Sequence, residues 1–143
     1  MGIRIKISAD INPTEDEEKV LHTIKNLIGT HKKIDAKILE RINKKEINLE
    51  GGLELLGNLK REITIRQLQP LVRAILFRNK RETTSFILLN KQALYANHIV
   101  ICDSPSESPL GPIKIEINGD KEEDLKLAIY WLTEDSDLIR ISL

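Results

Sequence analysis

The sequence predicts an α+β fold in which helices cover one face of a mostly antiparallel sheet, as a two-layer sandwich. Three observations support this class. Strand-like alternation opens the chain, helical spacing fills two regions behind it, and several strand-like segments follow one another before a last helical stretch. The 143 residues fit a single domain, 1–143, and 41% of them are hydrophobic. Because only 3% are aromatic, the core must consist of aliphatic side chains.

The N-terminal third is predicted to form a strand, a helix and a second strand. Isoleucines alternate with polar residues over residues 3–8, which is the period of a strand with one buried face. Residues 15–28 have helical spacing and follow a capping-box pattern, TEDE, at residues 14–17. Gly29 is a plausible stop for this helix. Residues 37–49 are interpreted as a strand that can fold into a hairpin.

Two helices, three strands and a last helix are predicted in the remaining chain. The two helices and three strands lie near residues 53–63, 69–82, 83–89, 98–102 and 113–117. Pro70 belongs near the start of its helix, because a proline deep inside would remove a backbone hydrogen bond. Asp120 is predicted to cap the last helix, and Ser108–Pro112 is expected to form a rigid loop.

The charges are balanced overall but not along the chain. Lysine plus arginine equals aspartate plus glutamate, at 22 each. Residues 60–102 nevertheless carry a net charge of +6, and residues 103–143 carry −6. A segment as basic as 60–102 can attract phosphates if its cations share one face.

Three stretches of the sequence resemble a known family. They are INPTEDEEKV at 11–20, FILLNKQAL at 86–94 and ESPLGPIKIEI at 107–117. These stretches are similar to signatures of a conserved archaeal family of uncharacterised proteins grouped as RNA-binding. That family is similar in fold to the large-subunit ribosomal protein numbered five. The resemblance implies a ribosomal-protein-like fold and an RNA ligand, and it implies no reaction.

The basic segment contains the candidate RNA-binding residues. If Leu71, Val72, Ile75 and Leu76 face the core, a 100° step per residue places Arg73, Phe77 and Lys80 on the far side of the helix, with Arg81 adjacent. Cations on such a face displace the counterions of phosphates, and an exposed aromatic ring can stack on an unpaired base. The alternative is a solvated helix with Phe77 packed under a loop or at a dimer contact.

A second candidate group follows the strand near residues 83–89. Asn90, Lys91 and Gln92 offer donors for phosphate and sugar contacts. Alternatively, Asn90 makes a turn and Gln92 caps a strand edge. The leading hypothesis is a non-enzymatic cytoplasmic protein that contacts the backbone of structured RNA. The contacts are assigned to Arg73, Lys80, Arg81 and Lys91, with Arg66 and Arg78 in support.

No catalytic residue, metal site or cofactor is predicted. The three histidines lack metal-ligand spacing, and Cys102 ends an aliphatic strand, where it is expected to be a small buried hydrophobe. No signal peptide or membrane span is expected. Two other hypotheses remain open. One is an interaction module or homodimer held by complementary charge, and the other is a metal-dependent hydrolase using the acidic start of the last helix, residues 120–124.

Overall fold

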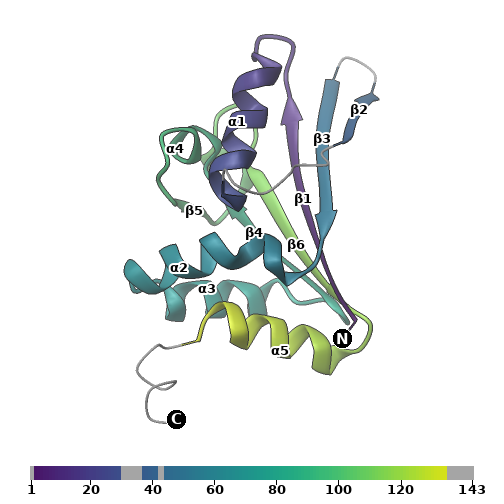
Figure 1. Ribbon diagram of the computed structural model, residues 1–143, viewed down its shortest axis with the longest axis vertical. Coiled ribbons are helices and arrows are strands. Elements are labelled where there is room, and N and C mark those ends of the chain that lie inside the picture. Colours follow the sequence, from purple (N-terminus) through teal and green to yellow (C-terminus); the bar gives the residue numbers. More distant parts are fainter. Residues whose placement is uncertain (1, 30–36, 42–43, 135–143) are drawn as a thin grey trace.

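The protein is a six-stranded antiparallel sheet with helices packed on one face (Figure 1). The computed structural model describes residues 2–29, 37–41 and 44–134. The strand order is β2-β3-β1-β6-β4-β5. The elements are β1 (Ile3–Ile11), α1 (Glu17–Ile28), β2 (Lys37–Arg41), β3 (Lys44–Gly51), α2 (Gly57–Ile65), α3 (Gln69–Arg78), β4 (Thr84–Leu89), α4 (Lys91–Tyr95), β5 (Ile101–Cys102), β6 (Ile113–Gly119) and α5 (Glu122–Leu132), with 3₁₀ turns at Leu53–Leu56 and Pro105–Glu107. The predicted α+β class and the hairpin near 37–49 are confirmed.

Alternation along the strands separates a buried face from an uncovered one. On the central strand β1, Ile5 and Ile7 are fully buried, and Ile7 lies opposite Leu49 of β3 and Ile115 of β6. These residues join the aliphatic stripes of the helices in one hydrophobic core. The intervening side chains, such as Ser8, point to the other face of the sheet, which the helices leave uncovered (Figure 1).

The helix starts differ from the predicted caps. α1 begins at Glu17, and its N-cap is Asp16, whose carboxylate accepts a hydrogen bond from the Glu18 amide at 3.0 Å. Thr14 is therefore not the cap. The Glu15 carboxylate, one residue later, accepts a hydrogen bond from the Asn12 amide at 3.0 Å.

The N-cap of the last helix also differs from the predicted residue. The N-cap of α5 is Lys121, not Asp120, and the Asp124 carboxylate accepts from its amide at 3.2 Å. Asp120 pairs with Arg4 on β1 at 3.3 Å.

The region between α3 and β5 also differs from the prediction. α3 ends at Arg78 and not near residue 82, because Arg81 and Thr84 exchange backbone hydrogen bonds in a turn that starts β4. The strand expected over 98–102 is only Ile101–Cys102, and the short helix α4 precedes it. Asn90 caps α4, since its side chain accepts from the Ala93 amide at 2.8 Å.

Candidate nucleic-acid interface

The predicted cations occupy several places along the helical layer. Arg66 is the C-cap of α2, Arg73 lies in the middle of α3, Arg78 is its last residue, and Arg81 stands just before β4. Since ten helical residues span about 15 Å, Arg66 and Arg81 lie at opposite ends of α3. The cations form a path along α3 and not a single cluster.

Arg73 and Phe77 face another helix. α3 and α5 lie side by side (Figure 1). Arg73 donates from Nε to the Thr133 hydroxyl at 2.9 Å and from Nη2 to the Thr133 carbonyl at 3.0 Å. Its guanidinium lies 4.9 Å from the Tyr130 ring centre, and the Phe77 ring lies 5.7 Å from the same ring. The predicted open face at Arg73 and Phe77 is corrected, because α5 packs there and Arg73 caps its C-terminus.

The orientation of α3 explains this correction. Val72, Ile75 and Leu76 are buried as predicted, but Leu71 is 49% exposed. The core-facing stripe is therefore narrower than predicted, and Phe77 is partly buried at its margin.

Three other cations pair with carboxylates. Lys80 contacts Glu122 at 2.7 Å, Arg78 contacts Asp103 at 3.2 Å, and Arg66 contacts Glu62 one helical turn away at 3.2 Å. Glu122 and Asp103 belong to the acidic C-terminal third. The bipolar charge of the sequence is thus partly neutralised within one chain.

Two arginines are exposed and have no carboxylate partner in the described parts of the chain. The Arg81 guanidinium donates only to the Lys80 carbonyl, at 3.0 Å, and the Arg61 side chain on α2 has no polar contact among the described residues. Exposed cations of this kind are available to an external anion.

Lys91 is buried and serves as an internal clamp. Its ammonium donates to the Asp10 carbonyl at 2.8 Å, to the Leu110 carbonyl at 2.9 Å and to both oxygens of Glu15 at 3.0 and 3.2 Å. The side chains of Lys91 and Glu15 are 4% and 10% exposed. Lys91 is therefore not the exposed cation that the sequence predicts, since its charge is neutralised away from solvent, and its assignment to RNA stays a prediction.

The neighbours of Lys91 complete the same network. The Lys91 amide donates to the Ser108 hydroxyl at 3.1 Å, and Gln92 donates from Nε2 to the Pro109 carbonyl at 2.7 Å. Asn90 donates to the Glu107 carbonyl at 3.3 Å. The three stretches that carried the family resemblance therefore meet in one place, which we call the Lys91 hub: Glu15, Asn90, Lys91, Gln92, Ser108 and Leu110.

Hydrogen bonds from Asn12 and Lys91 lower the pKa of Glu15. Burial raises the pKa of this carboxyl, but the hydrogen bonds from the Asn12 amide and side chain and from Lys91 outweigh burial. Glu15 therefore stays ionised at pH values below the ordinary pKa of a glutamate, so the ion pair with Lys91 is kept.

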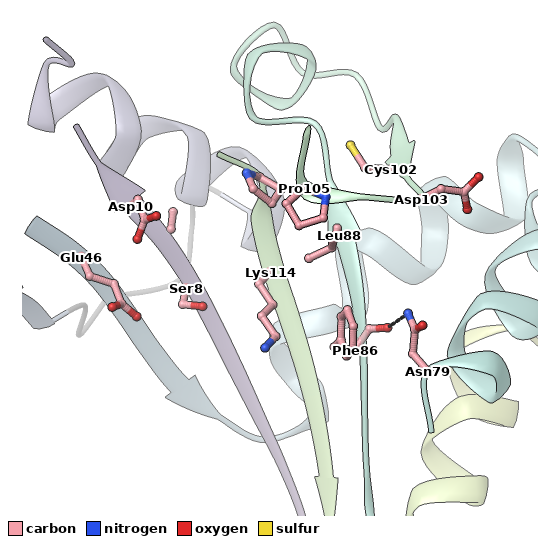
Figure 2. Close-up of a pocket in the computed structure, with 12 residues that line it drawn as sticks. Ser8, Asp10, Glu46, Asn79, Phe86, Leu88, Cys102, Asp103, Pro105 and Lys114 are labelled. Carbon is pink, nitrogen blue, oxygen red and sulfur yellow. Dashed lines mark hydrogen bonds between the residues drawn. The ribbon is translucent and has the colours of Figure 1, made fainter. Parts of the chain in front are cut away.

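The uncovered sheet face contains a cavity of about 390 Å³ (Figure 2). Ser8 and Asp10 of β1 and Glu46 of β3 lie on one side of it, and Phe86 of β4 with Asn79 lies on the other. Lys114 of β6 lies between them, with its ammonium 4.9 Å from the centre of the Phe86 ring. None of these residues is among the binding groups predicted from the sequence. Phe86 and Lys114 lie in two of the stretches that resemble the family, and strand alternation was the other local signal.

Within residues 2–29, 37–41 and 44–134, no three histidine, cysteine, aspartate or glutamate side chains gather in a way that could hold a metal ion. Cys102 is buried as predicted, and burial raises the pKa of its thiol, with Glu107 and Asp103 adding to the effect. None of the helices in this part of the chain has both the length and the apolarity to cross a membrane.

Comparisons with known proteins agree on one group. A family model described as RNA binding matches residues 4–118. The chain is 35% identical over 141 residues to a UPF0201 protein of Methanosarcina acetivorans, covering 91% of this chain and 84% of that protein. It is 32% identical over 130 residues to a UPF0201 protein of Sulfurisphaera tokodaii, covering 91% and 86%.

Solved structures show the same fold. The crystal structure of a UPF0201 protein from Methanococcus jannaschii matches with a TM-score of 0.77 and 24% identity over 93% of this chain and 94% of that one. A DUF54 protein from Methanothermobacter thermautotrophicus matches with a TM-score of 0.59 and 18% identity over 94% and 100%. The likeness to the ribosomal protein stays a prediction.

Proposed function

We propose, from the premise that the chain belongs to the archaeal UPF0201 family whose model is described as RNA binding, that this protein binds RNA without catalysing a reaction. The match over residues 4–118 is the observation that carries the proposal. The proposed place of action is the cytoplasm. The proposed phosphate contacts are Arg78 and Arg81, with Arg66 at the other end of α3.

We chose Arg78 and Arg81 because their side chains are exposed and are not held by a buried carboxylate. The Arg78 and Asp103 side chains are 56% and 68% exposed. An exposed pair contributes only about 0–1 kcal/mol, so a phosphate can replace Asp103 at little cost. Arginine also forms two parallel charge-assisted bonds to a phosphate. Arg81 needs no exchange, since it has no carboxylate partner in the described residues.

The same reasoning leaves the other candidates outside the phosphate surface. Lys91 is buried in its hub, and Arg73 would have to leave both atoms of Thr133. Lys80 is held at 2.7 Å by Glu122, with a side chain only 20% exposed. The proposed phosphate contacts are therefore fewer than the cations predicted from the sequence.

The homodimer stays a prediction without a specific observation in its favour. Its motivation was the complementary charge of the middle and the C-terminal third. The pairs Arg78–Asp103 and Lys80–Glu122 use part of that complementarity within one chain.

The test is the salt dependence of RNA binding. The probe is a stem–loop RNA with a randomised loop, and the readout is fluorescence anisotropy at several salt concentrations. The double variant Arg78→Gln/Arg81→Gln is compared with Lys19→Gln/Lys25→Gln, which removes the same charge from exposed positions on α1.

Loss of two phosphate contacts should reduce the slope of log K against log salt by about 1.4 to 1.8. The α1 control should keep the wild-type slope. Absence of RNA binding by the wild-type protein at low salt would overturn the proposed function. Equal effects of the two double variants would overturn the assignment to Arg78 and Arg81.

A further inference from the structure

The uncovered sheet face presents an aromatic ring where a strand would normally place a polar residue. On β4, Ser85, Ile87 and Leu89 point into the core, so the alternation directs Phe86 to the opposite face. Phe86 is partly exposed there, at the wall of the cavity in Figure 2. The chain has only two phenylalanines, and the other, Phe77, packs against Tyr130.

A cation accompanies this ring. The ammonium of Lys114 lies 4.9 Å from the Phe86 ring centre and 4.0 Å from a carboxylate oxygen of Glu116. The Lys114 side chain is 45% exposed. Both contacts are weak ones for an exposed lysine, so Lys114 can move to a stronger anion.

Hydrogen-bonding groups lie on both sides of the cavity. Asn79 donates from Nδ2 to the Phe86 carbonyl at 3.0 Å, as the dashed line in Figure 2 shows. In the described parts of the chain, the Asn79 amide oxygen and the Ser8 hydroxyl have no hydrogen-bond partner. A nucleobase matches this set, since it presents a π-face for the ring and polar edges for hydrogen bonds.

The cavity adjoins the proposed phosphate contacts. Asp103, which lines the cavity, is the residue that pairs with Arg78. The turn between Arg81 and Thr84 leads directly into β4. Lys114 lies beside Phe86, while Asp10 and Glu46 lie on the far side of the cavity (Figure 2). A strand of RNA that follows β4 can therefore place phosphates at Arg78 and Lys114 and a base at Phe86.

We infer that the sheet-face cavity binds an unpaired RNA base stacked on Phe86, with Lys114 moving from the ring to the adjoining phosphate. This inference rests on the proposed function and adds a substrate class, single-stranded RNA or a loop, to it. The base occupies the cavity beside β4, and the paired part of the RNA stays outside it.

Photocrosslinking locates the contact. The stem–loop probe carries 4-thiouridine in its loop, and the crosslinked protein is digested with trypsin. Phe77 and Phe86 fall in different tryptic peptides, residues 74–78 and 82–91. The expected adduct is on 82–91. An adduct on 74–78 without one on 82–91 would overturn the inference and leave RNA binding in place.

Affinity measurements provide a matched comparison. Phe86→Leu keeps an apolar side chain but removes the π-face, and Phe77→Leu makes the same change on α3. Stacking on an aromatic residue predicts about a tenfold loss of affinity for Phe86→Leu. Phe77→Leu should bind like the wild type, and Lys114→Gln should weaken binding and lower the salt slope by about 0.7.

Binding to a fully paired RNA of the same length distinguishes the stacking of an unpaired base on Phe86 from RNA binding in general. The wild type should prefer the stem–loop, and Phe86→Leu should remove that preference. Equal affinity of Phe86→Leu and the wild type for the stem–loop would overturn the inference. Failure of the wild type to bind either RNA would overturn the proposed function itself.

Discussion

Replacing Lys91 with methionine should strongly destabilise the protein. The substitution keeps an unbranched side chain but removes the ammonium that serves Glu15, the Asp10 carbonyl and the Leu110 carbonyl. Removing one partner of a buried ion pair costs about 3–5 kcal/mol, since the other charge is left unpaired. For 143 residues the unfolding entropy is about 0.3 kcal/mol per degree, so the melting temperature should fall by about 10–17 °C.

The matched control is Lys45→Met. Lys45 pairs with Glu17 at 3.2 Å, the same distance that separates Lys91 from one oxygen of Glu15. The Lys45 and Glu17 side chains are 46% and 40% exposed, so this change should cost less than about 1 kcal/mol. Calorimetry at pH 7 measures both variants. Equal melting temperatures for Lys91→Met and Lys45→Met would refute the argument that burial makes the difference.

Acid provides a second readout of the same pair. A carboxyl whose pKa is lowered by folding stabilises the folded state when the pH is above the carboxyl's ordinary pKa. This stabilisation is lost as the pH falls through the lowered pKa. The pKa of Glu15 is lowered from an ordinary value of 4.5. The difference in stability between the wild type and Glu15→Gln should be full at pH 7 and shrink below about pH 4.5. A difference that grows in acid would contradict this sign.

Three further outcomes follow from individual contacts. Arg73→Leu should cost about 1–3 kcal/mol in chemical denaturation, since Thr133 loses two donated bonds at the end of α5, and Arg73→Lys should restore only part of it. The Cys102 thiol should react with a maleimide only after unfolding, because it is 2% exposed and its pKa is raised; rapid labelling of the native protein would disprove this. Gly119→Ala should lower the melting temperature, because a β-carbon there would lie 2.7 Å from the Leu125 amide nitrogen; an unchanged value would show that α5 shifts freely.

The sequence predicted elements wherever the signal was local. The alternation of β1 and β6 and the spacing of α1 depend on neighbouring residues, so these elements were found within a few residues of their bounds. The five-residue helix α4 was missed, because it is too short to show a helical period. Caps were misplaced for a related reason. Several side chains near a helix start can accept a hydrogen bond from the same backbone amide. Glu15 and Asp120 have tertiary partners instead, and these contacts determine which side chain becomes the cap.

The candidate site depended on contacts that no local pattern contains. Arg73 faces Thr133, which is 60 residues later, and Lys91 binds Glu15, which is 76 residues earlier. Helical geometry places Arg73 and Phe77 on one face, but only the position of α5 shows that this face is covered. Strand alternation likewise turns Phe86 and Lys114 away from the core. Their proximity also requires the register of β4 against β6, in which Leu88 lies opposite Lys114.

The central position of β1 has a consequence for synthesis on the ribosome. This strand precedes the other strands of the sheet in the chain, yet one of its edges pairs with β6, and Ile3 lies opposite Gly119. The nascent chain must therefore leave this edge of β1 unpaired until β6 has been translated. Such long-range pairing folds slowly and favours aggregation of the unfinished chain. Protection by a chaperone during translation should therefore raise the yield of native protein.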